Sequence, residues 1–386
     1  MMDSKANQEP AACSDEHWMQ IALSLAARGQ GVVEPNPMVG CVLVKDQQLI
    51  GQGYHHAFGL DHAEVDALKS LASAAEAEGA TAYVTLEPCC HHGKTPPCSE
   101  ALIAAKVRRV VIAMADPFPK VSGGGIEQLK QAGIDVTLGV LQQQAEALNA
   151  PYLKLVRTGM PWVIAKWAMT ADGKIATVMG ESQWITGQQS RHQVHLLRSR
   201  VDAIVVGMGT VAADDPLLTA RINNQESQSV QPARVAQRIV LCHKRLPSSD
   251  AKLIQTATKI PTWLYFSPLV DSEQLRVLQE MGAQAVSLST SDQSLMVREL
   301  LTKLGDAKLS NIMIEGGGEL LGSFIHTQHC LIDECHVYVG ATLFGGKQAS
   351  GPIAGLGLPH LDQAPRFDLQ SVDSFGQDVR MILRRI

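Results

Sequence analysis

The sequence predicts an α/β protein, and three observations support this fold class. The chain has 386 residues, which suits two domains of ordinary size better than a single core. Hydrophobic residues make up 45% and charged residues 18%, the balance of a folded globular protein. Runs typical of strands alternate with runs typical of helices, which indicates helices packed in layers on sheets.

The first half opens with a helix and then alternates. The run "DEHWMQIALSLAAR" over residues 15–28 has helical apolar spacing, and Gly29 ends it. A hairpin-like pair, "MVGCVLVKD" and "QLIGQGYH", follows with a polar turn between its strands. The further expected elements are helices over 62–73, 98–106 and 126–133 and strands over 81–87, 108–114 and 134–139.

A long helix over residues 140–159 leads to the second half, where Pro161 precedes a fresh strand pattern. We place the boundary here, with a flexible N-terminal tail at 1–14, a first domain at 15–155 and a second at 156–386. The polar stretch over 221–237 is expected to be a surface loop. The strand-like runs of the second half cover 162–169, 201–207, 238–242, 262–267, 283–289, 310–318, 334–345 and 379–386.

Charge and targeting signals argue against several classes of partner. The formal charge of -5 is modest and does not favour a dedicated nucleic-acid surface. The N-terminal stretch "MMDSKANQEPAACSDEHW" is polar and acidic, unlike a signal peptide, and no window approaches the roughly 20 apolar residues of a membrane span. We therefore expect a cytoplasmic protein with neither a nucleic-acid nor a membrane partner.

Cysteine and histidine cluster in one short segment. Within "EPCCHHGKTPPC" lie Cys89, Cys90 and Cys98, and in a reducing compartment such a cluster favours metal binding or catalysis over disulfides. Upstream, "DHAEVDALKS" offers His62 and Glu64 at the first turn of an expected helix. His-x-Glu, then Pro-Cys, then a second Cys is the ligand order of zinc deaminases.

The chemistry of such a site explains these residue types. Three protein ligands leave the fourth tetrahedral zinc position for a water molecule, and zinc lowers the pKa of that water towards neutrality. A carboxylate outside the metal shell must then move protons. We therefore assign His62 and two cysteines to zinc and Glu64 to proton transfer, with Cys89, directly after Pro88, as the first thiolate.

The second thiolate is Cys90 or Cys98. Adjacent cysteines rarely both reach one ion from a tight turn, whereas Cys98 begins the next expected helix, where free N–H groups and the helix dipole stabilise a thiolate. This favours Cys98. The alternative is a structural zinc site in which His91 or His92 supplies a fourth ligand and Glu64 is a solvated helix carboxylate.

The segments "HAE", "EPCCHHGKTPPC" and "PNPMVGCVLV" resemble the cytidine-deaminase superfamily, and within it the bifunctional deaminase–reductases of riboflavin biosynthesis. The wide spacing of Cys89 and Cys98 departs from the Pro-Cys-x-x-Cys of ordinary nucleoside and RNA deaminases. The resemblance implies a three-layer α/β/α, cytidine-deaminase-like first domain with Asn36 as a pyrimidine contact. By composition alone, Asn36 between two prolines is a turn residue.

The stretch "NIMIEGGGELLGSF" is the most informative part of the second half. A strand runs into three glycines and then a helix, so backbone N–H groups at the turn can approach a phosphate with the helix N-terminus behind them. Such glycines also occur purely for packing, and three in a row are not the G-x-G-x-x-G fingerprint. The motif alone therefore leaves both interpretations open.

The family resemblance continues through "KWAMTADGKIA", "GESQWITG", "HLLRS" and "VGMGTVAADDPLLTAR", so it covers nearly the whole chain after residue 15. It implies a second three-layer domain, similar to dihydrofolate reductase, that uses NADPH. The cofactor-binding positions that it implies are Ala168, Trp184, Thr210, Asp214, Gly316, Gly317 and Gly318. The substrate-binding positions that it implies there are Ser182, Arg198, Leu218, Arg221 and Glu315.

Several of these positions have a second interpretation. Forked, permanently charged arginines suit a phosphoribosyl group, but Arg198 is otherwise a surface helix charge and Arg221 a loop charge. Trp184 offers a flat face to a ring or belongs to the core. Lys166 and Asp172 lie in a matching motif without an assigned role.

The resemblance implies a two-domain enzyme of flavin synthesis. Its first domain, with one Zn²⁺, would hydrolytically deaminate a diaminopyrimidinone ribosyl phosphate, and its second would use NADPH to reduce the ribosyl group to ribityl. A homo-oligomer, dimer or larger, is expected. Two alternatives remain: a tRNA or cytidine deaminase with an unrelated appendage, which should show a basic face, and a binding protein with a structural zinc, which would tolerate loss of Glu64.

Overall fold

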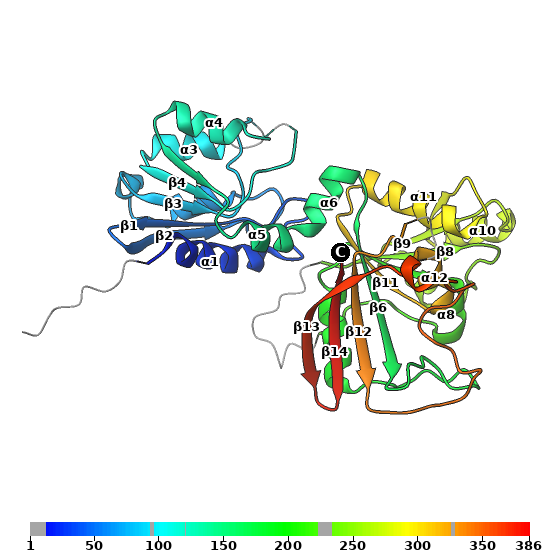
Figure 1. Ribbon diagram of the computed structural model, residues 1–386. Coiled ribbons are helices and arrows are strands. Elements are labelled where there is room, and N and C mark those ends of the chain that lie inside the picture. Colours follow the sequence, from blue (N-terminus) through cyan, green and yellow to red (C-terminus); the bar gives the residue numbers. More distant parts are fainter. Residues whose placement is uncertain (1–12, 93–95, 120, 223–233, 326–328) are drawn as a thin grey trace, which may run out of the picture. The chain divides into compact units, whose positions relative to one another are not determined.

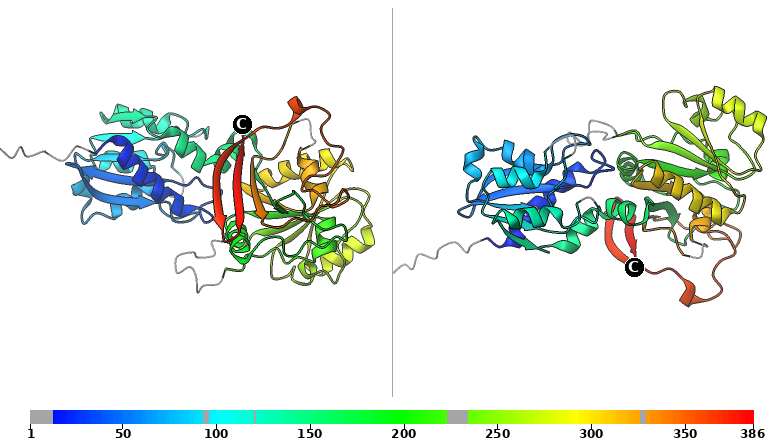
Figure 2. Two further views of the ribbon diagram at one scale, coloured as in Figure 1. Left: turned by 60° about the horizontal axis from the view of Figure 1, so that its bottom comes forward. Right: turned by 90° about the horizontal axis from the view of Figure 1, so that it is seen from above.

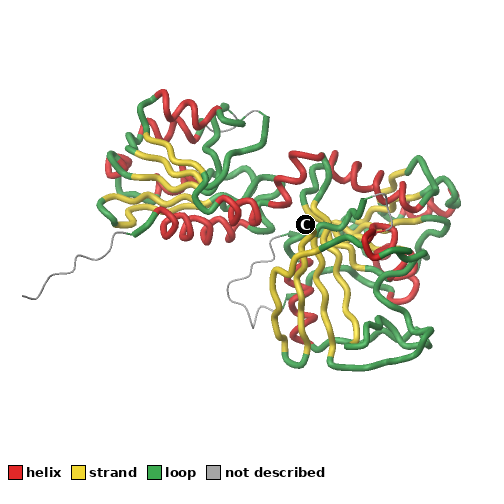
Figure 3. The backbone as a smooth tube through the Cα atoms, in the orientation of Figure 1, coloured by secondary structure: helices red, strands yellow, loops and turns green. Residues whose placement is uncertain are grey.

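The computed structural model describes residues 13–92, 96–119, 121–222, 234–325 and 329–386. The predicted tail at 1–14 and the predicted surface loop at 221–237 lie largely outside these residues. The chain divides into two compact units, Met1–Arg157 and Thr158–Ile386, each with its own sheet (Figures 1 and 3). The domain limits 155 and 156 stay a prediction.

The first unit is built on a five-stranded sheet of order β2-β1-β3-β4-β5. β1 pairs antiparallel with both β2 and β3, whereas β3, β4 and β5 run parallel. Parallel neighbours require crossover connections, and the helices supply them. The strands are β1 (Gly40–Lys45), β2 (Gln48–Tyr54), β3 (Thr81–Val84), β4 (Arg109–Ile112) and β5 (Asp135–Leu138).

Helices cover both faces of this sheet, as Figure 1 shows for α1 and α5 on one side and α3 and α4 on the other. Met19 of α1 and Val42 of β1 belong to one apolar core, whereas Leu43 of β1 and Leu102 of α3 belong to a second. Alternate strand residues therefore pack into the apolar cores on opposite faces of the sheet, and the three-layer prediction is confirmed. The helices are α1 (Asp15–Ala26), α2 (Ala63–Lys69), α3 (Cys98–Ala104), α4 (Gly124–Gln131), α5 (Gln142–Leu148) and α6 (Ala150–Thr158).

The second unit is built on a nine-stranded sheet of order β10-β9-β8-β7-β11-β6-β12-β14-β13. In this order, the first seven strands, from β10 to β12, run parallel to one another. Strands β14 and β13 add an antiparallel edge, which both views in Figure 2 show in red. The strands are β6 (Trp162–Thr170), β7 (Ala203–Gly207), β8 (Gln237–Cys242), β9 (Thr262–Phe266), β10 (Gln284–Ser287), β11 (Asn311–Glu315), β12 (Glu334–Gly340), β13 (Phe367–Phe375) and β14 (Asp378–Arg385).

Two apolar cores lie on the two faces of this sheet, which again gives three layers. Leu300 of α11 and Phe324 of α12 pack against one face, whereas Val211 of α8 and Leu278 of α10 pack against the other. The helices are α7 (Gln188–Arg198), α8 (Met208–Asp214), α9 (Lys252–Gln255), α10 (Ser272–Glu280), α11 (Gln293–Asp306) and α12 (Gly318–Ile325).

The structure differs from the predicted elements in two places. The single helix expected over 140–159 is two helices, α5 and α6, that meet at Asn149. Pro151 has no N–H to continue the hydrogen-bond ladder of α5, so the first helix stops there. Strand β13 was not predicted at all, although it is nine residues long.

Candidate functional site

His62 and Glu64 lie at the N-terminus of α2, the helix that follows β2. His62 is the N-cap residue of α2, with extended backbone, and Glu64 follows in the first turn with only 3% of its surface exposed. The helix can sit this close to the sheet because β2 carries Gly53, where a Cβ would lie 2.3 Å from the backbone nitrogen of Ala67. The glycines of the segment "GQGY" therefore allow the close approach of α2 to β2.

The three predicted metal ligands come together. His62 Nδ1 lies 3.6 Å from Cys89 Sγ and 3.3 Å from Cys98 Sγ, and all three ligand atoms lie within 4.8 Å of one another. A tetrahedral zinc with Zn–S of about 2.3 Å and Zn–N of about 2.0 Å sets nitrogen and sulfur about 3.5 Å apart. The donor set and its spacing therefore fit zinc.

Proton affinities within this group are mutually dependent. Hydrogen bonds with Cys98 and His62 together lower the pKa of Cys89 to about 4, although burial acts in the opposite direction. The Cys89 thiolate in turn raises the pKa of Cys98 and that of His62. Because thiolates are the form that binds zinc, metal binding would displace the proton of Cys98.

The N-terminus of α3 acts on Cys89 and not on Cys98. The sequence predicts that the N–H groups at the beginning of α3 stabilise the Cys98 thiolate. Instead, the backbone N–H of Cys98 donates to Cys89 Sγ at 3.3 Å. The N-terminus of α3 thus lowers the pKa of the neighbouring thiol, because the turn brings Cys89 in front of it.

Glu64 has the properties of a proton carrier. Burial raises its pKa to about 7, and the charge of Cys89 acts in the same direction. A carboxyl group that titrates near neutrality can both accept and donate a proton at working pH. Its burial contradicts the interpretation of Glu64 as a solvated helix carboxylate.

The alternative ligands lie elsewhere. Cys90 Sγ contacts the carbonyl oxygen of Val121 at 3.8 Å, and His92 is exposed beside Glu100 at 3.6 Å. His91 is exposed as well. Within the part of the chain that the structure describes, the ligand group has three members, which is the number of an open catalytic zinc site.

Asn36 lies next to this group through His55. The buried His55 ring packs edge-on against His62 at 5.5 Å between centroids. Its Nδ1 bonds the carbonyl oxygen of Asp61 at 2.9 Å and therefore carries the proton, so its Nε2 accepts from Asn36 Nδ2 at 3.2 Å. His55 thus fixes the orientation of the Asn36 amide, a role that its loop position in the sequence did not reveal.

The second unit contains a buried ion cluster centred on Glu315, the last residue of β11. Arg198 from α7 binds its carboxylate with both arms of the guanidinium, each at 2.8 Å, and Lys166 of β6 approaches at 3.3 Å. Burial alone would raise the pKa of Glu315, but Arg198 and Lys166 lower it well below the usual range. Because its side chain is only 12% exposed, Arg198 is not the surface helix charge that was one interpretation.

The loop with Leu218 and Arg221 is tied to the same helix. The backbone N–H of Arg221 donates to His195 Nδ1 at 3.3 Å, and Arg198 donates to the carbonyl oxygen of Thr219 at 3.2 Å. Leu218 is buried with a positive φ of 53°. The structure thus gathers Arg198, Leu218, Arg221 and Glu315, although they come from separate motifs.

The predicted cofactor positions form a second group along α8. Gly317 N–H donates to Thr210 Oγ1 at 3.1 Å, and the hydroxyl of Ser182, a predicted substrate contact, donates to Asp214 Oδ1 at 3.3 Å. Gly316 and Gly318 are the chain neighbours of Gly317, and Gly318 begins α12. The glycine-rich turn therefore lies beside the first turn of α8, and Ser182 lies beside its last residue.

Trp184 and Ala168 complete the predicted set. Trp184 is 68% exposed, so the interpretation that it belongs to the core is wrong. The Arg191 guanidinium lies 4.4 Å from the Trp184 ring centroid, so one face of the ring is covered by a cation. Ala168 lies in β6 opposite Tyr338 of β12.

Sequence reasoning left Lys166 and Asp172 unassigned and missed His195. Lys166 is the register partner of Glu315, which only strand pairing reveals. Asp172 accepts the N–H groups of Phe344 at 3.1 Å and Gly345 at 2.7 Å, so it ties down the chain after β12. The signal for His195 was its spacing of three residues from Arg198 on one helix.

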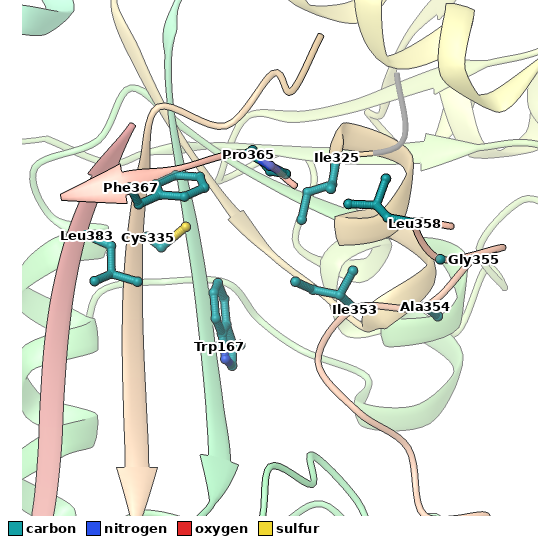
Figure 4. Close-up of a pocket in the computed structure, with 11 residues that line it drawn as sticks. Trp167, Ile325, Cys335, Ile353, Ala354, Gly355, Leu358, Pro365, Phe367 and Leu383 are labelled. Carbon is teal, nitrogen blue, oxygen red and sulfur yellow. The ribbon is translucent and has the colours of Figure 1, made fainter. Parts of the chain in front are cut away.

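A pocket of about 430 Å³ lies on the face of the second sheet that is opposite the Glu315 cluster. Figure 4 shows Trp167, Phe367 and Leu383 projecting into it from the sheet, with Ile353 opposite. Trp167 follows Lys166 on β6, and neighbouring strand residues point to opposite faces. None of the lining residues is a predicted site residue, so the pocket is separate from the Glu315 cluster.

Comparisons with known proteins bear on both units. The model of the cytidine and deoxycytidylate deaminase zinc-binding region matches residues 13–114, and that of the RibD C-terminal domain matches residues 161–381. Riboflavin biosynthesis protein RibD of Actinobacillus pleuropneumoniae is 39% identical over 367 residues, covering 95% of this chain and 94% of its own. The protein of that name from Escherichia coli K12 is 41% identical over 370 residues, covering 95% and 98%.

Solved structures agree. Acinetobacter baumannii RibD, form 1, superimposes with a TM-score of 0.83 at 38% identity, covering 96% of this chain and 99% of that one. The diaminohydroxyphosphoribosylaminopyrimidine deaminase/5-amino-6-(5-phosphoribosylamino)uracil reductase of Thermotoga maritima gives 0.81 at 32% identity, with the same coverage of 96% and 99%.

Fold, ligand group and matched models define a zinc deaminase joined to a reductase. The chain belongs to the RibD family of riboflavin biosynthesis proteins. It is a bifunctional hydrolase and oxidoreductase whose cofactors are Zn²⁺ and NADPH, as predicted. None of the helices in the described part of the chain combines the length and apolarity that a bilayer crossing requires.

Proposed function

We propose that the first unit deaminates 2,5-diamino-6-(5-phosphoribosylamino)pyrimidin-4(3H)-one and that the second reduces 5-amino-6-(5-phosphoribosylamino)uracil. The observation that carries this proposal is the three-ligand group His62, Cys89 and Cys98 beside the buried Glu64. A Thermotoga maritima relative, similar over 96% of this chain, is named as a diaminohydroxyphosphoribosylaminopyrimidine deaminase/5-amino-6-(5-phosphoribosylamino)uracil reductase.

In the deaminase, His62, Cys89 and Cys98 would hold the metal. When bound, zinc supplies the Lewis acidity that makes a water molecule nucleophilic near neutral pH. Glu64 takes up a proton and returns it to the leaving amine, which its pKa of about 7 allows. Asn36 orients the pyrimidine, because His55 holds its Nδ2 and leaves the amide oxygen to accept a ring N–H.

In the reductase, NADPH supplies a hydride when bound, and the residues of this chain orient the two reactants. We assign Gly316 to Gly318 and Thr210 to the cofactor phosphates, with Ala168, Trp184 and Asp214 as further cofactor contacts. Gly-rich backbone at the start of α12 suits a phosphate.

The substrate of the reductase would lie by the Glu315 cluster, with Ser182 and Leu218 as further contacts. Glu315 already engages both arms of the Arg198 guanidinium, so we assign the substrate phosphate to the exposed Arg221. Glu315 and Arg198 would then position the sugar.

The test is NADPH oxidation, followed by absorbance, with the diamino substrate and full-length protein in zinc-loaded and zinc-stripped form. We expect oxidation only with zinc, because deamination must come first. Glu64→Gln should retain zinc and lose deamination by about 10²- to 10⁴-fold while still reducing the deaminated compound. Glu78→Gln, an exposed glutamate, is the matched control. Oxidation of the diamino substrate without zinc, or full activity of Glu64→Gln, would sink the proposal.

Three expectations about the whole protein remain proposals. The chain would form a homo-oligomer, dimer or larger, would act in the cytoplasm and would take small pyrimidine ribosyl phosphates without binding nucleic acid. Sedimentation of the purified protein with and without added RNA tests the first and third together.

A further inference from the structure

Glu87 is a buried carboxylate that lies two residues before Cys89. Only 3% of its surface is exposed. Its Oε2 accepts the backbone N–H groups of Asp116 at 3.2 Å and Gly123 at 3.1 Å. Its Oε1 accepts those of Gly125 at 3.0 Å and Ile126 at 3.2 Å. Four backbone donors therefore converge on one side chain.

Three of these four donors belong to the beginning of α4. Gly123 is the N-cap residue of this helix, and Gly125 and Ile126 lie in its first turn. The N–H groups there have no acceptor within their own helix, and a negative charge in front of them is favourable. Glu87 therefore caps α4 from outside, across a gap of 36 residues in the sequence.

Three glycines at residues 123–125 let α4 approach the turn that carries the proposed zinc ligand Cys89. A Cβ on Gly125 would lie 1.9 Å from the carbonyl oxygen of Pro88, and one on Gly124 would lie 2.7 Å from Cys90 Sγ. Gly123 has a φ of 82°, which glycine adopts readily. The start of α4 thus packs on the backbone between Glu87 and Cys90 without room for a side chain.

The same helix reaches the other cysteine ligand. One turn into α4, Gln128 Oε1 accepts the Ser99 hydroxyl at 2.6 Å, and its Nε2 donates to the carbonyl oxygen of Cys90 at 3.5 Å. The N–H of Ser99, the residue after Cys98, donates to the carbonyl oxygen of Cys89 at 3.2 Å. Helix α4 therefore joins the two chain segments from which the thiolates project.

We propose that Glu87 is a positioning residue of the zinc site. By fixing the start of α4 on the turn after β3, it holds Cys89 and, through Gln128 and Ser99, Cys98 at the spacing that zinc requires. It does not bind the metal itself. This inference rests on the proposed role of Cys89 and Cys98 as zinc ligands.

A carboxylate is required here for a chemical reason. Four N–H donors need acceptor lone pairs on both oxygens, which an ionised carboxylate has. In Glu87→Gln, one oxygen becomes an NH₂ group that would face two N–H donors, so one buried and one partly buried donor lose their partner. The substitution keeps the shape of the side chain but should detach one side of the cap.

The experiment uses full-length, zinc-loaded protein as wild type, Glu87→Gln, Gln128→Ala and a control. Glu127→Gln is the control, because Glu127 lies on the same helix, is exposed and bonds only Gln131 among the contacts that the structure describes. Zinc affinity is measured by competition with a chelator, and the visible spectrum of the Co²⁺-loaded protein reports ligand geometry. Reduction of the deaminated substrate measures the amount of active chain.

We expect Glu87→Gln to lose zinc affinity by roughly 10- to 100-fold, to shift the Co²⁺ spectrum at full occupancy and to retain reductase activity. Gln128→Ala should change both readouts in the same direction by less, and Glu127→Gln should change neither. If Glu87→Gln has the affinity and spectrum of the wild type, the inference is wrong. If Glu87→Gln does not fold, an unchanged spectrum and affinity in Gln128→Ala overturn it. A wild type that binds no zinc would instead overturn the proposed function.

Discussion

His195 illustrates, at the residue scale, how neighbouring cations set the protonation of a side chain. Burial, together with the charges of Arg198 and Arg221, lowers its pKa to about 4. Its Nδ1 must stay unprotonated to accept the N–H of Arg221. The residue is therefore neutral in the folded protein over the range in which histidine ordinarily titrates.

This depressed pKa predicts a pH dependence of stability. Between about pH 6.5 and pH 4, the unfolded chain binds a proton at His195 that the folded chain does not, so the free energy of unfolding falls as the pH is lowered through this window. His195→Gln removes that contribution and should lose less stability between pH 7 and pH 5 than the wild type.

The measurement is urea unfolding followed by tryptophan fluorescence at the two pH values. Of the five tryptophans, Trp18 alone lies in the first unit, so the signal reports mainly on the second. His192→Gln, on the same helix, is the matched control. Parallel losses of stability in wild type and His195→Gln would contradict the prediction.

Single residues were predicted unevenly, and the reason is physical. Metal chemistry restricts zinc ligands to a few residue types, so His62, Cys89 and Cys98 were recognisable in the sequence, and the structure brings the three together. The contacts of Lys166 and Glu87 depend on strand register and on a helix that arrives from a distant part of the chain. Such contacts leave no local pattern.

At the scale of elements, α7 is anchored by a side chain from another part of the fold. Asp378, at the start of β14, is buried and accepts the N–H of Gly187 at 2.7 Å and the hydroxyl of Ser190 at 2.6 Å. Gly187 is the N-cap residue of α7, and Arg198 ends the helix. Asp378 therefore supplies the cap that glycine cannot.

We expect Asp378→Ala to destabilise the second unit by about 1 to 2 kcal/mol, the usual cost of losing a helix cap. Because the other end of α7 carries Arg198, the KM of the reductase for its substrate should rise as well. Chemical denaturation and steady-state kinetics measure the two effects. Asp368→Ala, an exposed aspartate on β13, should have neither, and a silent Asp378→Ala would refute the capping role.

Strand β13 shows why one element escaped prediction. Its pairing with β14 has an irregularity between Leu369 and Ser371, so an extra residue interrupts the alternation. The next apolar residue after Leu369 is Val372, three positions on, so the alternation of apolar and polar residues is interrupted there. Strands β7 and β8 are shorter, but they are buried and have continuous apolar runs, and both were predicted.

For the whole molecule, separate cores predict separate unfolding. The apolar clusters of the first unit and those of the second share no residue. A ligand stabilises the state that binds it, by about 2.7 kcal/mol at a free concentration 100 times its Kd. Zinc bound by the first unit should therefore raise the unfolding temperature of that unit alone.

Differential scanning calorimetry of the full-length chain tests this expectation. Zinc should move one transition upward, and NADPH should move the other. The His62→Ala variant is the control, because it removes a ligand and should abolish the zinc-dependent shift without changing the response to NADPH. A single transition that both ligands raise would show that the units unfold together.

Strand β6 serves two faces of the second sheet with adjacent residues. Lys166 faces the ion cluster and pairs in register with Glu315, whereas Trp167 lines the apolar pocket on the other side. Inserting or deleting one residue ahead of Lys166 would exchange these faces and place an indole among charges and an ammonium group in a hydrocarbon layer. In evolutionary terms, an insertion or deletion in this strand costs more than a substitution at one of its positions.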